Sequence, residues 1–129
     1  MSLIKCASII CYLICHSLSG VREFCETETF QAQCQPDEVI SMTVAKYGRM
    51  KIGRCVRKDL GYLGCFSDVL PIADRKCSGK QTCEIRMPDA DFDQTKPCLE
   101  ELKTYMEARY DCIKGLSQPD TQLAIQKLI

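Results

Sequence analysis

Cysteine constrains the fold of this chain more than any other residue type, because its 129 residues include 11 cysteines. Three of them lie near the N-terminus, and the other eight can close four disulfides. A domain of this size has a modest apolar core, so cross-links that restrict the unfolded chain, worth about 2–4 kcal/mol each, are needed for a unique fold. Sequence order alone leaves roughly a hundred pairings open. The eight are Cys25, Cys34, Cys55, Cys65, Cys77, Cys83, Cys98 and Cys112.

The three N-terminal cysteines belong to an apolar stretch over residues 6–15, which follows Lys5 and precedes the small residues Ser17 and Ser19. This order is typical of a signal peptide. The stretch is about half of the ~20 residues that cross a bilayer. A buried N-terminal helix, the alternative, would carry a polar face. We therefore predict a signal peptide over residues 1–19, cleaved after Ser19 or alternatively Gly20, and a secreted, extracellular mature protein without a membrane span.

Few residues of the predicted mature chain suit catalysis. The single histidine, His16, lies in the predicted leader, so the mature chain lacks the usual general base and the commonest zinc ligand. Cysteines in disulfides supply no thiolate for catalysis or for a metal. Hydrolysis by a carboxylate pair is the remaining alternative, but no pair lies in an apolar context that would separate two pKa values. The sequence predicts that the chain is not an enzyme and uses no metal or cofactor.

Charge is balanced in total but uneven along the chain. Basic and acidic side chains number 17 each, and loss of Lys5 with the leader leaves a mature charge of −1, which gives no general attraction to nucleic acid or membranes. Basic residues crowd positions 46–58, which we interpret as the solvated surface of a hairpin rather than a heparin site. Acidic residues mark the second half. The absence of asparagine excludes N-linked glycosylation.

Apolar residues alternate with polar ones in three segments, which is the period of a half-buried strand. Residues 27–34, 39–45 and 104–112 show this pattern. Residues 83–87 are predicted to return as a fourth strand after the small cysteine loop of residues 77–83. The expected inward side chains are Phe30, Ala32, Ile40, Met42, Val44, Met106, Ala108 and Tyr110.

Shorter elements are expected between these strands. Residues 51–56 and 61–66 indicate short strands or structured loop. A brief helix is expected to begin at Ser67 or Pro71 and to run to Lys76, because proline is tolerated in the first turn of a helix.

The domain limits follow from the cysteines and from composition. Residues 88–98 are polar and rich in turn residues, which predicts a surface loop. Residues 20–112 are predicted to form one domain that contains all eight cysteines. The tail, residues 113–129, is expected to be a loosely attached end or a short frayed helix.

Four short motifs follow one another between Cys25 and Cys112. Each is weak alone, but the four in order with eight cysteines are specific. With these motifs the chain resembles the SUEL-type, or rhamnose/galactose-binding, lectin domain, which is also found in latrophilin-like receptors. The resemblance implies an α+β, mainly β fold: a small disulfide-rich antiparallel β-sandwich with one or two short helices. The motifs are Cys25-Glu26, Ala45-Lys46-Tyr47-Gly48-Arg49, Arg75-Lys76-Cys77-Ser78-Gly79-Lys80 before Cys83, and Pro97-Cys98 with Tyr105-Met106 and Tyr110-Asp111-Cys112.

The resemblance also implies a disulfide pattern, which the sequence alone leaves open. The pattern is consistent with the predicted strands, because two of the alternating segments end on cysteines that could meet in the core. The implied pairs are Cys25 with Cys55, Cys34 with Cys112, Cys65 with Cys98, and Cys77 with Cys83.

A sugar site is implied at two matching positions. Glu26 matches the family's first carboxylate and Tyr47 the tyrosine that lines the site; such polar groups grip neighbouring sugar hydroxyls. Structural roles are the alternatives, with Glu26 an exposed residue at a strand edge and Tyr47 an aromatic at the edge of the core. For Tyr47, and for Arg49 of the same motif, we prefer the structural role, in which Arg49 pairs with a carboxylate and fixes the loop.

The sequence departs from the family pattern around Cys98. Lys96 stands where the family has an aspartate before Pro-Cys, so a cation replaces the second carboxylate. Glu100 replaces a glycine that would let the backbone approach the sugar. Lys103 matches the family's lysine when counted from Cys98, whereas Thr104 takes that place when counted from the C-terminal side. The candidate sugar-binding residues are Glu26, Tyr47, Lys103 and Lys96.

These observations predict a secreted carbohydrate-binding module of the galactose/rhamnose type with a partly altered sugar site. The ligand would be a galactose- or rhamnose-like sugar or, given the lysines, an acidic glycan. The alternative is a secreted protein-interaction module or ligand that has lost sugar binding and contacts an extracellular protein. A disulfide-rich protease inhibitor or toxin is less favoured, because no exposed reactive loop is evident. The oligomeric state is left open.

Overall fold

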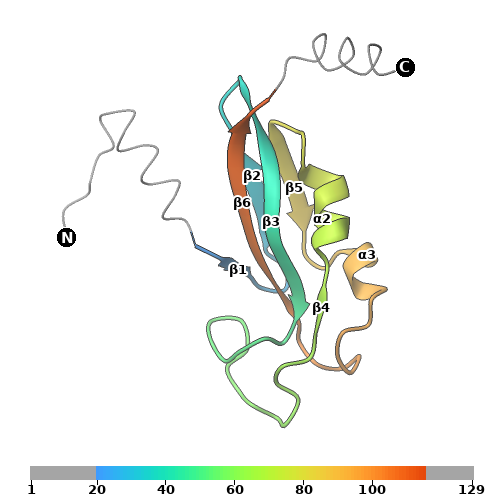
Figure 1. Ribbon diagram of the computed structural model, residues 1–129. Helices are drawn as coiled ribbons and strands as arrows, with labels where there is room; N and C mark the ends of the chain where they lie inside the picture. Colours follow the sequence, from blue (N-terminus) through green and yellow to red (C-terminus); the bar gives the residue numbers. More distant parts are fainter. Residues whose placement is uncertain (1–19, 116–129) are drawn as a thin grey trace, which may run out of the picture.

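The computed structural model describes residues 20–115, which form two antiparallel β-sheets and two short helices (Figure 1). The larger sheet has the strand order β1-β6-β3-β4, and the smaller one pairs β2 with β5. The predicted signal peptide and most of the predicted tail lie outside the described residues. The elements are β1 (Arg22–Phe24), β2 (Thr29–Gln33), β3 (Glu38–Gly48), β4 (Phe66–Asp68), α2 (Leu70–Cys77), β5 (Thr82–Arg86), α3 (Ala90–Asp93) and β6 (Tyr105–Lys114).

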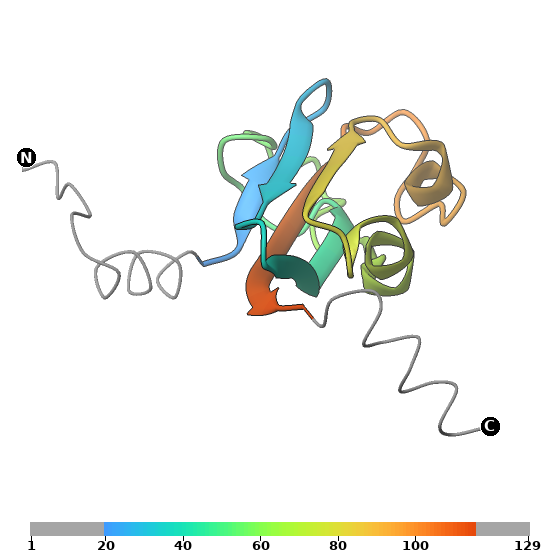
Figure 2. The same cartoon turned by 90° about the horizontal axis from the view of Figure 1, so that it is seen from above.

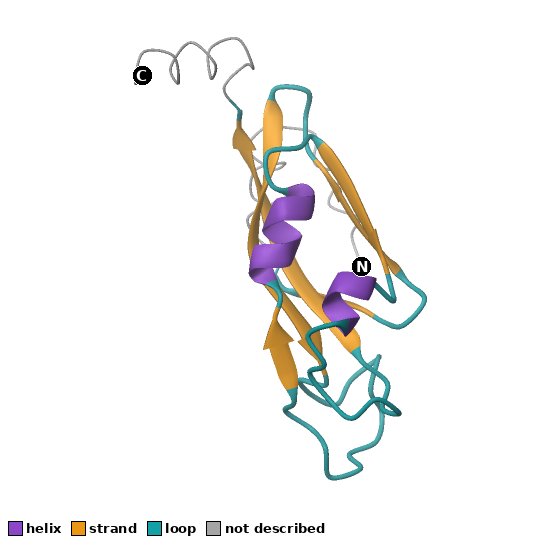
Figure 3. Cartoon of the chain, turned by 90° about the vertical axis from the view of Figure 1, so that its right-hand side faces the viewer, coloured by secondary structure: helices purple, strands orange, loops and turns teal. Residues whose placement is uncertain are grey.

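The mainly β, antiparallel fold class is confirmed. The two long strands β3 and β6 pair along their length, and α2 lies beside them (Figure 3). The β2–β5 ribbon lies apart from these strands, and the view from above shows the two sheets on either side of the interior (Figure 2). The side chains buried between them form one apolar core, which includes Phe30, Ile40, Ile85, Phe92 and Met106.

Strand positions agree with the alternation except at one point in β3. Ile40 and Met42 face the core as predicted, but Val44 does not, and Ala45 and Tyr47 are buried instead. The register against β6 shifts between Met42 and Val44, so a β-bulge exchanges the two faces of the strand there. The prediction for Val44 was therefore wrong, because alternation assumes an unbroken period of two.

Both faces of β6 are covered over its first half. Met106 and Ala108 are buried as predicted, but Tyr105 and Glu107 are buried as well. The loop after β3 covers this second face, since the Lys51 N–H donates to the Tyr105 hydroxyl at 3.0 Å. β6 also continues through Ile113 and Lys114, which the sequence assigned to the tail.

Among the shorter elements, β1 was not predicted. Residues 51–56 form bends and loop, the second of the two alternatives that the sequence left open for them. Residues 61–66 are loop up to the start of β4. The basic residues at 46–58 therefore extend from the end of β3 into the long loop that joins β3 to its antiparallel partner β4.

A short helix interrupts the segment predicted as a surface loop. α3 begins after Asp89, whose carboxylate accepts hydrogen bonds from the backbone N–H groups of Asp91 and Phe92 at 3.0 and 3.1 Å. This is the capping arrangement that satisfies free N–H groups at a helix start. Phe92 is fully buried. The loop prediction was wrong here because one apolar side chain and one cap were enough to order a single turn.

Gly48 ends β3 at a point where two backbones meet. Its φ is +154°, and a Cβ there would collide with the carbonyl oxygen of Cys65 and lie 2.5 Å from the Cα of Phe66. Only glycine lets β4 approach this closely. The strand end and the loop that follows are fixed against each other as a result.

The four disulfides join the same cysteines that the family resemblance implies. Cys34–Cys112 spans 78 residues and ties β2 to β6, so it links the two sheets. Cys77–Cys83 spans only 6 residues and ties the end of α2 to β5. The other two pairs, Cys25–Cys55 and Cys65–Cys98, fasten the long loop after β3.

Candidate functional site

The predicted site residues meet at the end of the molecule where β3 ends and the long loops gather (Figure 1). Glu26, Tyr47, Lys96 and Lys103 all line one cavity of about 550 Å³, which we call the Tyr47 cavity. Its wall also includes Asp93, Leu99, Glu100, Leu102 and Thr104. The cavity is formed by the end of β3, α3, the turn between β1 and β2 that carries Glu26, and the loop between α3 and β6.

Tyr47 is the most constrained side chain of this cavity. Its ring is 3% exposed and packs against Phe92, with ring centroids 5.5 Å apart. Its hydroxyl donates to Asp93 Oδ1 at 2.6 Å and accepts from Thr104 Oγ1 at 2.8 Å. Burial and the Asp93 carboxylate raise the pKa of Tyr47 to about 12. Tyr47 therefore packs at the edge of the core, which is the structural role that we preferred, and it also forms part of the cavity wall.

The raised pKa of Tyr47 predicts a pH dependence of stability. Folding favours the protonated phenol, so its contribution is complete below the ordinary pKa of 10.0 and is lost as the pH rises through about 12. We expect the free energy of unfolding to fall less steeply between these pH values in Tyr47→Phe than in the native sequence. Burial also raises the pKa of Tyr105, so some slope should persist. Urea unfolding at several pH values tests this, with the exposed Tyr62→Phe as control; equal slopes for all three proteins would contradict it.

Asp93 is a cavity residue that the sequence did not single out. It ends α3, its side chain is exposed, and it places a second carboxylate beside Tyr47. The sequence shows Asp89, Asp91 and Asp93 as three equivalent acidic residues. Only the single turn of α3 distinguishes them. Asp89 becomes the N-terminal cap of this helix, and Asp93 lies at the cavity.

The loop after α3 brings the remaining charged groups. Lys96 has a φ of +47°, a left-handed conformation that is uncommon for a lysine. Lys103 and Thr104 both line the cavity. The position of the family's lysine therefore falls on a cavity residue whether it is counted from Cys98 or from Cys112. Thr104 is the one that contacts Tyr47. Glu100 lies in the same wall and is exposed.

Arg49 holds two loops together, but not in the predicted way. Its guanidinium is buried and donates to the backbone carbonyls of Lys103 at 2.8 Å and Lys58 at 3.3 Å. The expected carboxylate partner was wrong, because the loop supplies carbonyl oxygens in its place. Glu26 is exposed, which agrees with the structural alternative for this residue. It also lines the cavity, where its charge contributes to the raised pKa of Tyr47.

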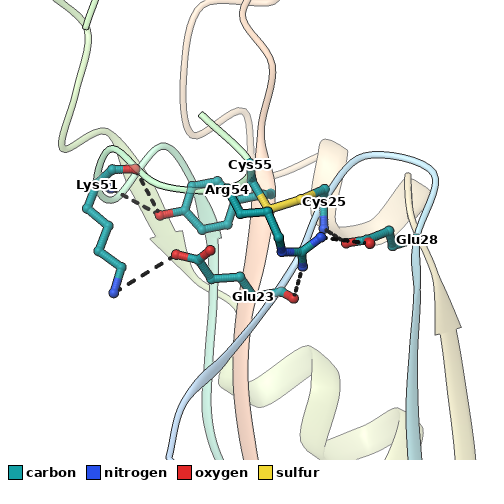
Figure 4. The surroundings of a disulfide bond; sticks show 7 residues. Glu23, Cys25, Glu28, Lys51, Arg54 and Cys55 are labelled. Carbon is teal, nitrogen blue, oxygen red and sulfur yellow. Dashed lines mark hydrogen bonds and ion pairs between the residues drawn. A yellow bond between two sulfur atoms is a disulfide. The ribbon is translucent and has the colours of Figure 1, made fainter. Parts of the chain in front are cut away.

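A cluster with metal-ligating residue types lies at the Cys25–Cys55 disulfide (Figure 4). Glu28 is the third member, and its carboxylate accepts from the Cys25 N–H at 2.6 Å and pairs with Arg54 at 2.8 Å. Sulfurs joined in a disulfide offer no thiolate to a metal. The cluster is thus structural: it anchors the long loop to the turn between β1 and β2.

The fold and the cavity define a class of protein: a small, disulfide-linked β domain of the binding type. Over residues 32–112 the chain matches the family model of the D-galactoside/L-rhamnose binding SUEL lectin domain. The chain belongs to this family, which is one of binding modules rather than enzymes. Its disulfides are typical of proteins that fold in an oxidising, extracellular-type compartment. Among residues 20–115, no helix has the length and apolar character needed to cross a membrane.

Its relatives are much longer proteins. The chain is 32% identical over 102 residues to Latrophilin Cirl of Drosophila mojavensis, which covers 75% of this chain and 6% of the relative. It is 31% identical over 94 residues to Protein eva-1 homolog C of Homo sapiens, covering 69% of this chain and 21% of the relative. Latrophilin-like protein 1 of Caenorhabditis elegans is 25% identical over 101 residues. The chain thus spans a small part of the length of these proteins.

Proposed function

We propose that this chain is a secreted carbohydrate-binding domain whose sugar site, the Tyr47 cavity, is altered relative to its family. Family membership supports binding of a galactoside- or rhamnose-like sugar. The observation that carries the proposal is the convergence of Glu26, Asp93, Tyr47 and Lys103 on one cavity. Carboxylates accept hydrogen bonds from sugar hydroxyls and an ammonium donates to them, which is the chemistry that a pyranose ring requires. The four disulfides and the predicted leader support secretion.

Two residues argue that neutral sugars bind weakly. Lys96 places a cation where the family has a carboxylate, and Glu100 adds a side chain to a wall that the family leaves as backbone. Loss of one hydrogen-bonded anchor costs about 1–3 kcal/mol, which is a large part of the binding free energy of a single sugar.

We therefore expect free galactose and rhamnose to bind with a dissociation constant no better than about 1 mM. Calorimetric or NMR titration of the oxidised protein measures this. Glu26→Gln should abolish what binding there is, whereas Glu84→Gln, an exposed change on β5, should not. Micromolar binding of either monosaccharide would contradict the altered site, and unchanged binding in Glu26→Gln would contradict its location.

A protein-binding role is the second candidate, and a specific observation favours it. Exposed apolar side chains gather in and next to the loop after β3: Ile52, Leu60, Tyr62, Leu63 and Phe66 are between 36% and 59% exposed, as is Leu99 across the Cys65–Cys98 disulfide. Contiguous exposed apolar surface is typical of interaction sites. A glycan array separates the candidates: binding to a defined set of glycans supports the lectin role, and a blank array with the correctly oxidised protein favours this alternative.

A further inference from the structure

We propose that a second cavity, next to the Tyr47 cavity, binds an anionic group of the glycan, namely a sulfate ester or a carboxylate. This inference rests on the proposed carbohydrate binding and names the class of sugar that the domain takes. The second cavity, which we call the Arg49 cavity, has a volume of about 430 Å³. It lies between the loop after β3 and the segment that leads into β6.

Charge is the first observation that supports an anionic ligand. Five cationic side chains line the Arg49 cavity against a single carboxylate, that of Glu101. Arg54 is already neutralised by Glu28 at 2.8 Å. Within the described part of the chain, the other four form no ion pair, so their charge is not compensated by acidic side chains. These four are Arg49, Arg57, Lys58 and Lys103.

The second observation is that the cavity is built around a buried cation. Arg49 is 3% exposed, and its Nε–H has no hydrogen-bond partner among the described residues. Its other nitrogens hold the Lys103 and Lys58 carbonyls, which fixes the two walls relative to each other. A buried guanidinium without a carboxylate is costly unless another anion offsets its charge. Such an anion in the cavity would supply that compensation.

The third observation is adjacency. Leu102 and Lys103 line both cavities, so one wall separates them. A sugar ring in the Tyr47 cavity would then present a charged substituent, or a neighbouring charged sugar, to Arg57 and Lys58. The two cavities also divide the chemistry, since Glu26, Asp93 and Glu100 disfavour an anion in the first and the cations favour it in the second. The anionic group of the glycan is thus recognised in the Arg49 cavity and not beside Lys96, which lines the Tyr47 cavity.

Variants at the exposed cations test the proposal without touching the folded core. Arg57 and Lys58 are exposed, and the Arg49 contact uses the backbone of Lys58, not its side chain. Arg57→Gln with Lys58→Gln removes two charges from the cavity. Lys80→Gln with Lys114→Gln serves as the matched control, because it removes the same charge at the far end of β3. Lys114 lies opposite Glu38 there, in the register of β3 against β6. Glu101→Gln is the opposite change within the cavity.

Titration with lactose, with sulfated lactose and with sodium sulfate at constant ionic strength gives the readout. We expect the sulfate ester to bind at least fivefold more tightly than lactose. Arg57→Gln with Lys58→Gln should abolish this preference and leave lactose binding unchanged, Glu101→Gln should increase it, and the control should preserve it. Amide resonances of residues 57 and 58 should shift with sulfate. Added salt should weaken the preference, because exposed charges are screened.

The outcomes separate the inference from the function on which it rests. Lactose binding without a preference for the sulfate ester, or a preference that survives the loss of Arg57 and Lys58, overturns the anion cavity and leaves carbohydrate binding intact. If no sugar binds while sulfate or an acidic peptide shifts residues 57 and 58, the glycan assignment is overturned, and the cavity belongs to a protein partner.

Discussion

Replacing Cys34 and Cys112 together by alanine is expected to lower the free energy of unfolding by about 4.5 kcal/mol. This disulfide closes a loop with a sequence separation of 78, the longest in the protein's described part, and removing it returns the most conformational entropy to the unfolded chain. It also joins β2 to β6, one strand from each sheet. A single domain of this size is stabilised by about 5–15 kcal/mol in total, so the variant should lose between about a third and nearly all of its free energy of unfolding.

The short disulfide provides the matched control. Cys77–Cys83 has a sequence separation of 6, for which the same entropy relation gives about 2 kcal/mol. Both variants replace two cysteines by two alanines, and one cysteine of each pair is buried. Urea unfolding of the two proteins should therefore show the larger loss for the longer loop. Equal losses, or the reverse order, would indicate that local packing rather than loop length determines what each disulfide contributes.

The fold class was predictable because its signals are local and repeated. Alternation located β2, the body of β3 and β6, the small cysteine loop located β5, and buried side chains such as Phe30, Ile40 and Met106 lie where the pattern placed them. Pro71 marked the first turn of α2. The order of strands in the two sheets was not predictable, since it depends on contacts between residues far apart in sequence.

The departures from prediction have tertiary causes. The bulge in β3 is a feature of its pairing with β6, so the sequence around Val44 gives no sign of it. The loop after β3 lacks any period, because two disulfides and the Arg49 hydrogen bonds hold it instead of a sheet. β1 has only three residues, too few to show alternation.

The candidate site was predictable where a family motif reached it and not elsewhere. Glu26 and Tyr47 were found because each lies in a motif, and Lys96, Glu100 and Lys103 because each could be counted from Cys98. Asp93 was missed because its role depends on the turn of α3, and the cations of the Arg49 cavity were read as solvated surface because their convergence depends on the fold of a loop.

The double change Lys96→Asp with Glu100→Gly is expected to raise affinity for galactose or rhamnose at least tenfold, about 1.4 kcal/mol. Both residues line the Tyr47 cavity and both side chains are exposed, so the core is not disturbed. The first substitution exchanges a cation for a carboxylate that can accept from sugar hydroxyls. The left-handed backbone at position 96, with a φ of +47°, is better tolerated by aspartate than by lysine. The second opens the wall to backbone contact.

Single variants and one triple variant show whether the gain comes from this cavity. Each single change should give part of the gain, because one restores an acceptor and the other removes an obstacle. Adding Glu26→Gln should cancel the gain, since Glu26 lines the same cavity and would bind the same ring. Calorimetry measures affinity, and unfolding curves check that the variants remain folded. A folded double variant without a gain would mean that Asp93, held by the Tyr47 hydroxyl at 2.6 Å, has already shaped the cavity for another ligand. Lys96 and Glu100 would then belong to a protein-binding surface, together with the exposed Leu99, which follows Cys98 of the Cys65–Cys98 disulfide.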